Sequence, residues 1–375
     1  MDAHAPGKHQ QQQQTAFRQS EKLYSRRDKP LDLRNIIDFN DPDTLCARVA
    51  GVSRIQLTHD LETPPSLPFE AYRAKRLPAY ALEAHPGLMI IPDALTDEAQ
   101  RWLARKCLCD CARPPNRTNL DPFFEMPEES LFTLAHTPSS QRVAENLSEA
   151  PRTIHSRVES GSVQTDVTVP RSKAYTQAET PERLLGHLRW CTLGQQYNWT
   201  TKNYDLGTSP FDPDLNALMK SIALAITHPS TAANNLPYDA NAFDGRLFCS
   251  QAGIVNYYGS RTTMAGHVDK TEETMDAPLI SLSIGLSCIY LVGGPTRDTS
   301  PAAMYLRSGD ILAMCGESRL AFHGVPRVFS DTCPLYLASP KAGVDDAEAA
   351  NYPDWCHFGS YLANHRINCN ARKCS

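Results

Sequence analysis

The stretch from residue 278 to residue 316, PLISLSIGLSCIYLVGGPTRDTSPAAMYLRSGDILAMCG, decides the expected fold. Gly, Asp and Pro divide it into short runs of β character at residues 278–285, 287–294, 302–309 and 310–316. Two similar runs lie outside it, GIVNYY (253–258) and HRINCNAR (365–372). Regular short strands favour a jelly roll or barrel over a doubly wound sheet. The turn RSGD, with Ser308, Gly309 and Asp310, is predicted to close a β-hairpin.

The sequence before residue 250 is predicted to be mainly helical. PGLMIIPD (86–93) is expected to form a short buried strand between helix breakers, and Thr96 to cap a helix that extends to about Cys111. Further helices are expected to begin at Thr180-Pro181 and Asp212-Pro213, each with an apolar stripe. The chain is therefore predicted to be an α+β protein with N-terminal helices and a double-stranded β-helix, or jelly roll, as its core.

Four segments are expected from these patterns. Residues 1–30, with Gln10–Gln14 and scattered charge, are predicted to be a disordered arm. Residues 31–135 are assigned to an N-terminal extension of helices and a strand. Residues 136–180 are polar, without hydrophobic periodicity, and are predicted to be a surface insertion. Residues 181–375 are assigned to the core and a lid over it.

Composition limits the classes of protein to consider. The net charge of -5 excludes a globally basic nucleic-acid binder, so a phosphate-contacting face has to be local. The candidates for such a face are Arg73, Lys75, Arg76, Arg101, Arg105 and Lys106. The sequence lacks a run of about 18 apolar residues and an apolar leader, so neither a membrane span nor secretion is expected. Twelve cysteines without a C-x-x-C pair indicate reduced thiols in an intracellular protein, with nucleus, cytoplasm and mitochondrion left open. The protein is expected to be a monomer.

A candidate metal site combines His267 and Asp269 with His323. A His-x-acid pair alone means little, because chance predicts about one in this chain. On an extended strand, however, residues two apart share a face and can chelate one ion. His323 follows four candidate strands later, where a barrel returns beside the first pair. Two imidazoles and one carboxylate suit Fe(II) or Mn(II) better than a closed zinc site.

A candidate anion site accompanies this metal site. Arg366, Asn368 and Arg372 would share one face of an extended strand, and two buried guanidinium groups need anionic partners. A dicarboxylate is a suitable partner, because guanidinium groups match carboxylates in a bidentate fashion. Asn256 and Tyr258 share a face of an earlier strand and are expected to add neutral donors. A core aromatic whose hydroxyl bonds the backbone is the open alternative for Tyr258.

These motifs together resemble the AlkB family of Fe(II)- and 2-oxoglutarate-dependent dioxygenases, and more closely its AlkB homologue 1 branch. The segments that resemble the family are IIDF (36–39), PGLMIIP, PNRTNLD, LRWCTLGQQYNW, AGIVNYY, LVGGPTRD, AMYLRSGDILAM, RLAFHGVPRV and RINCNAR. The resemblance spans roughly residues 30–130 and 180–375. It implies that His267, Asp269 and His323 bind Fe(II), and that 2-oxoglutarate is held by Asn256, Tyr258, Arg366, Asn368 and Arg372. O2 is the further co-substrate that it implies.

The resemblance further implies hydroxylation or demethylation of methylated bases in nucleic acid. The expected substrates are tRNA carrying 1-methyladenine or 5-methylcytosine, with N6-methyladenine in DNA as another member of this class. The residues predicted to contact the substrate are Trp190, Gln195, Gln196, Tyr197, Trp199, Glu272 and Arg319. Thr271 stands where the bacterial repair enzyme has an acidic residue, so its substrate range does not transfer directly. A histone-like protein side chain is the alternative substrate.

Overall fold

The computed structural model describes residues 14–41, 51–137, 153–161, 177–198, 200–226, 243–338 and 352–375. Most of the predicted insertion at 136–180, residues 1–13 of the predicted arm, and Trp199 lie outside these ranges. Among the described residues, no helix combines the length and the apolar character that a membrane span requires.

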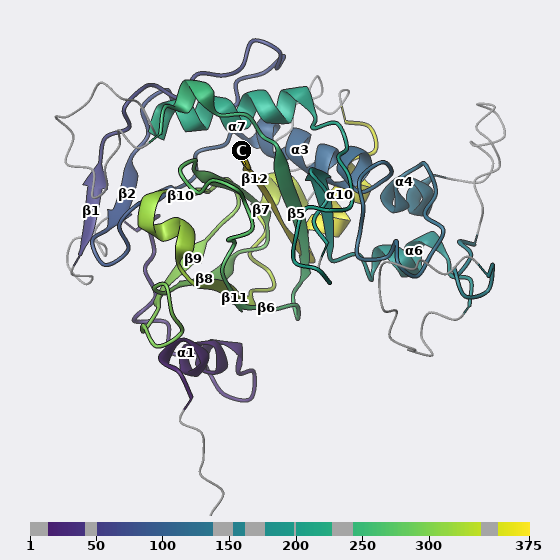
Figure 1. Ribbon diagram of the computed structural model, residues 1–375, viewed down its shortest axis with the longest axis horizontal. Coiled ribbons are helices and arrows are strands. Elements are labelled where there is room, and N and C mark those ends of the chain that lie inside the picture. The colour runs from purple at the N-terminus through teal and green to yellow at the C-terminus, as the bar shows by residue number, and fades with distance from the viewer. Residues whose placement is uncertain are drawn as a thin grey trace, which may run out of the picture.

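Two antiparallel sheets form the core of the protein (Figure 1). The large sheet has eight strands in the order β1 (Val52–Ile55), β2 (Ala79–Leu82), β3 (Leu88–Ile91), β10 (Ile311–Met314), β7 (Leu279–Gly285), β12 (His365–Arg372), β5 (Ala252–Gly259) and β4 (Trp190–Gly194). The small sheet has the order β6 (Met264–His267), β11 (His323–Val328), β8 (Cys288–Val292) and β9 (Ala302–Leu306). Neighbours that are distant in sequence, such as β12 between β7 and β5, are typical of a double-stranded β-helix, which confirms the predicted fold class.

The period of two along the strands divides the large sheet into two faces. On β12, Ile367, Cys369 and Ala371 belong to a core that the helices cover, whereas Arg366 and the alternate residues after it line a cavity between the sheets. Figure 1 shows the covering helices, which include α3 (Asp97–Arg105), α4 (Leu131–His136), α6 (Pro181–Leu185), α7 (Pro213–Ile226) and α10 (Trp355–Leu362). Shorter elements are α8 (Leu335–Ala338), η4 (Gly245–Leu247) and η5 (Gly316–Leu320).

The predicted helix starts are confirmed by their caps. The hydroxyl of Thr96 accepts the backbone N–H of Ala99, and that of Thr180 accepts the N–H of Arg183. The first of these helices changes character at Lys106, because the π-helix η1 (Lys106–Cys111) continues it. Within η1, Cys107 and Cys111 are buried in the core. All the cysteines in the described residues are free thiols, and Cys249 is exposed.

The predicted hairpin at Ser308-Gly309-Asp310 is wrong. The strand before it, β9, pairs with β8 in the small sheet, whereas β10 pairs with β3 and β7 in the large one. The turn therefore connects a strand of the small sheet to a strand of the large sheet. The side chain of Ser308 fixes its position, because its hydroxyl accepts the N–H of Gly285 at 2.9 Å and donates to Gln100 at 2.6 Å. Gly309 has a φ of 89°, which suits a glycine.

The predicted disordered arm is wrong for residues 16–25, which form the helix α1 (Ala16–Ser25) against the small sheet. The ring of Phe17 is fully buried where Gly266 and Gly293 have no side chains; a Cβ on Gly266 would lie 2.3 Å from this ring. The carboxylate of Glu21 accepts the N–H of Gly266. The 31–135 segment also enters the core, since β3 pairs directly with β10.

Replacing Phe17 by alanine is expected to lower the free energy of unfolding by about 3 kcal/mol, because a fully buried aromatic ring leaves a cavity. Leu23→Ala on the same helix is the control, since Leu23 is 53% exposed, and should change stability by less than about 0.5 kcal/mol. Urea unfolding of both variants provides the measurement. Equal stabilities would contradict the packing of α1 on β6.

Candidate functional site

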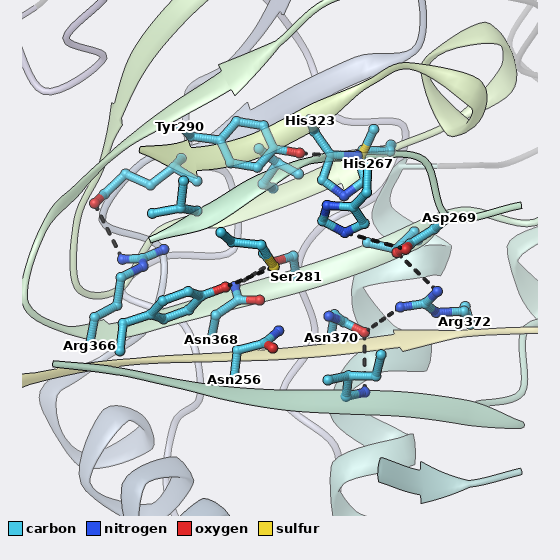
Figure 2. A pocket seen from close by; sticks show the side chains of 18 residues that line it. Asn256, His267, Asp269, Ser281, Tyr290, His323, Arg366, Asn368, Asn370 and Arg372 are labelled. Atoms are coloured by element: carbon cyan, nitrogen blue, oxygen red, sulfur yellow. Dashed lines mark hydrogen bonds and ion pairs between the residues drawn. The ribbon is translucent and has the colours of Figure 1, made fainter. Parts of the chain in front are cut away.

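Two imidazoles and one carboxylate meet where β6 and β11 pair (Figure 2). His267 is the last residue of β6, His323 the first of β11, and the two are paired in register. Asp269 follows two residues after β6, and its Oδ1 lies 3.6 Å from His267 Nε2. One ligand atom from each of the three residues falls within 4.8 Å of the other two. His267, Asp269 and His323 therefore lie close together in space, as the sequence predicted.

Backbone carbonyls orient both imidazoles. His267 Nδ1 lies 3.0 Å from the carbonyl oxygen of Ala265, and His323 Nδ1 lies 3.1 Å from that of Ala321. The Nδ1 atoms act as donors to these carbonyls, which leaves Nε2 as the lone-pair nitrogen of each ring. Such a second hydrogen bond fixes the tautomer and orientation of a metal-binding histidine.

The protonation states also suit a metal. Burial opposes ionisation of Asp269, but Arg372, His323 and His267 outweigh it and hold the pKa of this carboxyl well below its usual range. Burial, reinforced by His267, lowers the pKa of His323 to about 4. The carboxylate is thus ionised and the His323 imidazole neutral near pH 7, which are the metal-binding forms.

Arg366 lies in the same cavity and forms no close ion pair with any described carboxylate. Its side chain is buried, with Nη2 donating to Ser283 Oγ at 2.6 Å and Nη1 to the carbonyls of Leu286 and Leu306 at 3.2 and 3.3 Å. Within the described chain no carboxylate lies within 4.0 Å of this guanidinium group, and its Nε has no hydrogen-bond partner. A buried unpaired cation of this kind fits a carboxylate ligand.

Arg372 differs from Arg366 because carboxylates of the protein already surround it. Its Nη1 lies 2.9 Å from Asp269 Oδ2 and 3.0 Å from Glu272 Oε1. Asp269 and Glu272 both raise the pKa of Arg372 against the opposing effect of burial, so it stays charged. The two arginines of the predicted anion site thus have different surroundings: Arg366 is open to an anion, whereas Arg372 is paired with the candidate metal ligand.

The other predicted anion-site residues also line the cavity. Tyr258 on β5 donates its hydroxyl to the thioether of Met264 at 3.5 Å, and Asn368 donates to Ser281 Oγ at 2.6 Å. Asn256 lies on the same face of β5 as Tyr258. A thioether is a weak acceptor, so the hydroxyl of Tyr258 can turn to a stronger one.

Sequence reasoning missed three polar residues of this cavity, Ser281, Tyr290 and Asn370. The ring of Tyr290 stacks on that of His323, with centroids 5.9 Å apart, and its hydroxyl donates to the thioether of Met314 at 3.4 Å. The period of two would have identified Asn370, because it lies between Asn368 and Arg372 on their face of β12. The sequence carries no comparable signal for Tyr290.

The described residues among the predicted substrate contacts separate into half-buried and buried groups. Trp190 and Tyr197 are half-buried, and the Tyr197 ring packs edge-on against Tyr204, with centroids 5.4 Å apart. Gln195 forms a bridge with Thr208 across the loop that follows β4. The predicted role of Gln196 is corrected, because its buried amide donates to Gly194 O and Ser209 Oγ and accepts from Thr192.

The roles predicted for Glu272 and Arg319 are corrected as well. Their side chains are 0% and 1% exposed and lie 3.6 Å apart, so they pair with each other rather than face a substrate. In the predicted phosphate-contacting face, each cation is either paired with a carboxylate or buried. Arg73 pairs with Asp93 and Asp97, and Arg101 is buried. The remaining cations of that face have acidic partners too: Lys75 with Glu62, Arg76 with Asp60, Arg105 with Asp354, and Lys106 with Asp212.

A family model described as the 2OG-Fe(II) oxygenase superfamily matches residues 142–372. The chain belongs to this superfamily. Fe(II), 2-oxoglutarate and O2 are accordingly its metal and co-substrates, and the protein is a dioxygenase. The two imidazoles, the ionised carboxylate and the unpaired Arg366 fit this set in chemistry.

Relatives match over nearly the whole chain and identify the branch as ALKBH1 within the AlkB family. The DNA N(6)-methyladenine demethylase ALKBH1A of Arabidopsis thaliana is 31% identical over 377 residues, 96% of each chain. The tRNA demethylase abh1 of Schizosaccharomyces pombe is 29% identical over 96% of each chain. The nucleic acid dioxygenase ALKBH1 of Mus musculus is 32% identical over 96% of this chain and 83% of its own.

Proposed function

We propose that the protein oxidises methylated bases of nucleic acid, with tRNA as the first substrate and DNA carrying N6-methyladenine as the second. One observation carries the proposal: the His-Asp-His group shares its cavity with Arg366, a buried cation that has no carboxylate within 4.0 Å among the described residues. The relatives named as tRNA and DNA demethylases support the class of substrate.

In this proposal His267, Asp269 and His323 hold Fe(II). Arg366 binds the distal carboxylate of 2-oxoglutarate, and Tyr258, Asn256 and Asn368 supply neutral contacts along it. Arg372 keeps Asp269 ionised and fixes its Oδ2. The bound metal and co-substrate supply the oxidising power, as 2-oxoglutarate is converted to succinate and CO2.

The remaining work of the protein is to place the base and exclude water. The loop after β4 carries Tyr204, whose hydroxyl bonds Glu272, and Tyr197, whose ring packs on Tyr204; Trp190 precedes the loop on β4. Aromatic rings there suit the stacking of a base taken out of its strand, and Trp199 belongs to the same proposed set. Hydroxylation of an N-methyl group yields a hydroxymethyl product that releases formaldehyde, whereas a C-methyl group stays hydroxylated.

Nucleoside mass spectrometry tests the proposal. The full chain is incubated with Fe(II), 2-oxoglutarate and methylated tRNA, methylated DNA or methylated histone peptides, with Asp269→Ala as the blank. We expect loss or hydroxylation of methylated nucleosides, with tRNA turned over fastest. Oxidation of the peptides alone would overturn the nucleic-acid proposal in favour of a protein substrate.

Metal and co-substrate are expected to stabilise the folded protein together. Mn(II) with 2-oxoglutarate at about 100 times its Kd should add about 2.7 kcal/mol to the free energy of unfolding. The resulting rise in Tm should disappear on addition of a chelator and in His267→Ala. The Tm is measured by thermal unfolding of wild type without ligands, with Mn(II) and 2-oxoglutarate, and with both plus chelator, and of His267→Ala with Mn(II) and 2-oxoglutarate. An equal rise in His267→Ala would place the metal elsewhere.

A further inference from the structure

Three buried charged side chains adjoin the candidate metal ligand Asp269 and form one group with it. The group consists of Asp269, Glu272, Arg319 and Arg372, and we call it the charge cluster. Arg372 bridges Asp269 at 2.9 Å and Glu272 at 3.0 Å, and Arg319 lies 3.6 Å from Glu272. The formal charges cancel. Ions that are buried in this way persist only when each is paired in good geometry, so the removal of one disturbs the others.

Glu272 sits in this cluster where a substrate contact was expected. Its side chain is fully buried, and its Oε1 accepts from Arg372. The next residue is anchored as well, because the N–H of Glu273 donates to the carbonyl of Cys374 at 2.9 Å. Glu272 therefore faces the protein interior, and what it fixes is the position of Arg372.

The position of Arg372 in turn determines how Asp269 is presented. Arg372 holds Oδ2 of this carboxylate, while Oδ1 lies 3.6 Å from Nε2 of His267, on the side of the metal ligands. Groups that orient a ligand in this way tune metal affinity without touching the metal. Figure 2 shows Arg372 directed at Asp269 from the side away from His267.

A contact from the loop reaches the same cluster. The hydroxyl of Tyr204 donates to Glu272 Oε1 at 3.4 Å, and the ring of Tyr204 packs against Tyr197. The loop is itself braced by the bridges Gln195–Thr208 and Asn198–Asn203. A displacement of the loop would therefore move Glu272 through its hydrogen bond with Tyr204. It would reach Asp269 through the ion pairs Glu272–Arg372 and Arg372–Asp269.

We propose that Glu272 is a positioning residue for the metal ligand Asp269, and that Tyr204 couples the loop to it. Binding of a nucleic acid to the loop then tightens the binding of metal and co-substrate. By linkage, metal and co-substrate tighten the binding of nucleic acid by the same factor. The coupling rests on the proposed function, because it needs a substrate on the loop; the role of Glu272 does not.

The first experiment uses no nucleic acid. Mn(II) binding to the full chain is measured by calorimetry in the presence of 2-oxoglutarate, for wild type, Glu272→Gln and Glu273→Gln. Glu273 is the matched control because it is the next residue, has the same side chain and is exposed. We expect Glu272→Gln to bind Mn(II) about 10- to 100-fold more weakly, and Glu273→Gln to match wild type. Thermal unfolding without metal verifies that each variant is folded.

The second experiment adds a single-stranded RNA oligonucleotide with 1-methyladenine. In wild type it should tighten Mn(II) and 2-oxoglutarate binding by about 5-fold or more. In Tyr204→Phe, which removes only the hydroxyl, the oligonucleotide should still bind, but its effect on Mn(II) should fall below about 2-fold. Tyr305→Phe, whose ring packs on Phe329 at the far edge of the small sheet, is expected to behave as wild type.

The outcomes separate the ideas. Equal Mn(II) affinity in Glu272→Gln and Glu273→Gln overturns the positioning role, whatever nucleic acid does. Coupling that is absent in wild type, or persists in Tyr204→Phe, overturns the link through the loop. An oligonucleotide that fails to bind wild type overturns the proposed function and this link, while weaker Mn(II) binding in Glu272→Gln would still support its positioning role.

Discussion

Replacing Asp269 by alanine is expected to abolish turnover of 2-oxoglutarate, with a loss of at least about 1,000-fold, equivalent to about 4 kcal/mol. Asp269 is the sole carboxylate of the His-Asp-His group and the one anionic ligand it offers. Its loss also leaves Arg372 with Glu272 as its remaining ion-pair partner among the described residues. Succinate production and Mn(II) binding should fail together in this variant.

The control for this variant is Asp276→Ala, which removes an exposed carboxylate from the same segment after β6. It should keep full turnover, and thermal unfolding should show that both variants are folded. His323→Ala is expected to reproduce the loss seen in Asp269→Ala. Turnover within tenfold of wild type in purified Asp269→Ala would refute the assignment of the metal ligands.

The core strands were predictable from the sequence because their chemistry is local. A strand exposes alternate residues to one side, so Arg366, Asn368 and Arg372 had to share a face once residues 365–372 were extended. The convergence of His323 with His267 also followed from the count of strands between them. In the structure these two residues lie opposite each other on paired strands, and this register could not be read from the strand pattern alone, because it also depends on how the two strands pack.

The failures share a physical cause, which is that partners distant in sequence decide the outcome. The turn at Gly309 resembles a hairpin, but the strands on either side pair with different sheets. Helix α1 has few apolar residues, and it is ordered because Phe17 packs where Gly266 and Gly293 leave space. Composition alone cannot reveal a complementary surface some 250 residues away.

Polar residues were harder to assign than apolar ones for the same reason. Glu272 and Arg319 looked suited to a substrate because their partners were unknown, and the structure pairs them with each other and with Arg372. Arg73 was a candidate for contacting phosphate, but in the structure it pairs with Asp93 and Asp97. Arg366 shows the opposite case, since its lack of a carboxylate partner became informative only when the cavity was known.

Replacing Arg366 by leucine is expected to raise the KM for 2-oxoglutarate by about 100-fold or more, since truncating one partner of a buried charge pair costs about 2–5 kcal/mol. The guanidinium group donates hydrogen bonds to the Ser283 hydroxyl and to the carbonyls of Leu286 and Leu306. These neutral acceptors do not balance its positive charge, so an anionic ligand is expected to do so. Mn(II) binding without co-substrate should stay within about threefold of wild type, which distinguishes this variant from Asp269→Ala.

A second keto acid tests what Arg366 recognises. In 2-oxopentanoate a methyl group replaces the distal carboxylate, so wild type should bind it far more weakly than 2-oxoglutarate. Arg366→Leu should lose this preference, because no cation then faces the distal carboxylate of 2-oxoglutarate. Arg366→Lys should retain part of the preference, because an ammonium group keeps the positive charge but cannot bind a carboxylate with two parallel N–H groups. If Arg366→Leu still prefers 2-oxoglutarate by the wild-type factor, the distal carboxylate must bind another cation of the cavity, and Arg372 would be the candidate, at the expense of its pairing with Asp269.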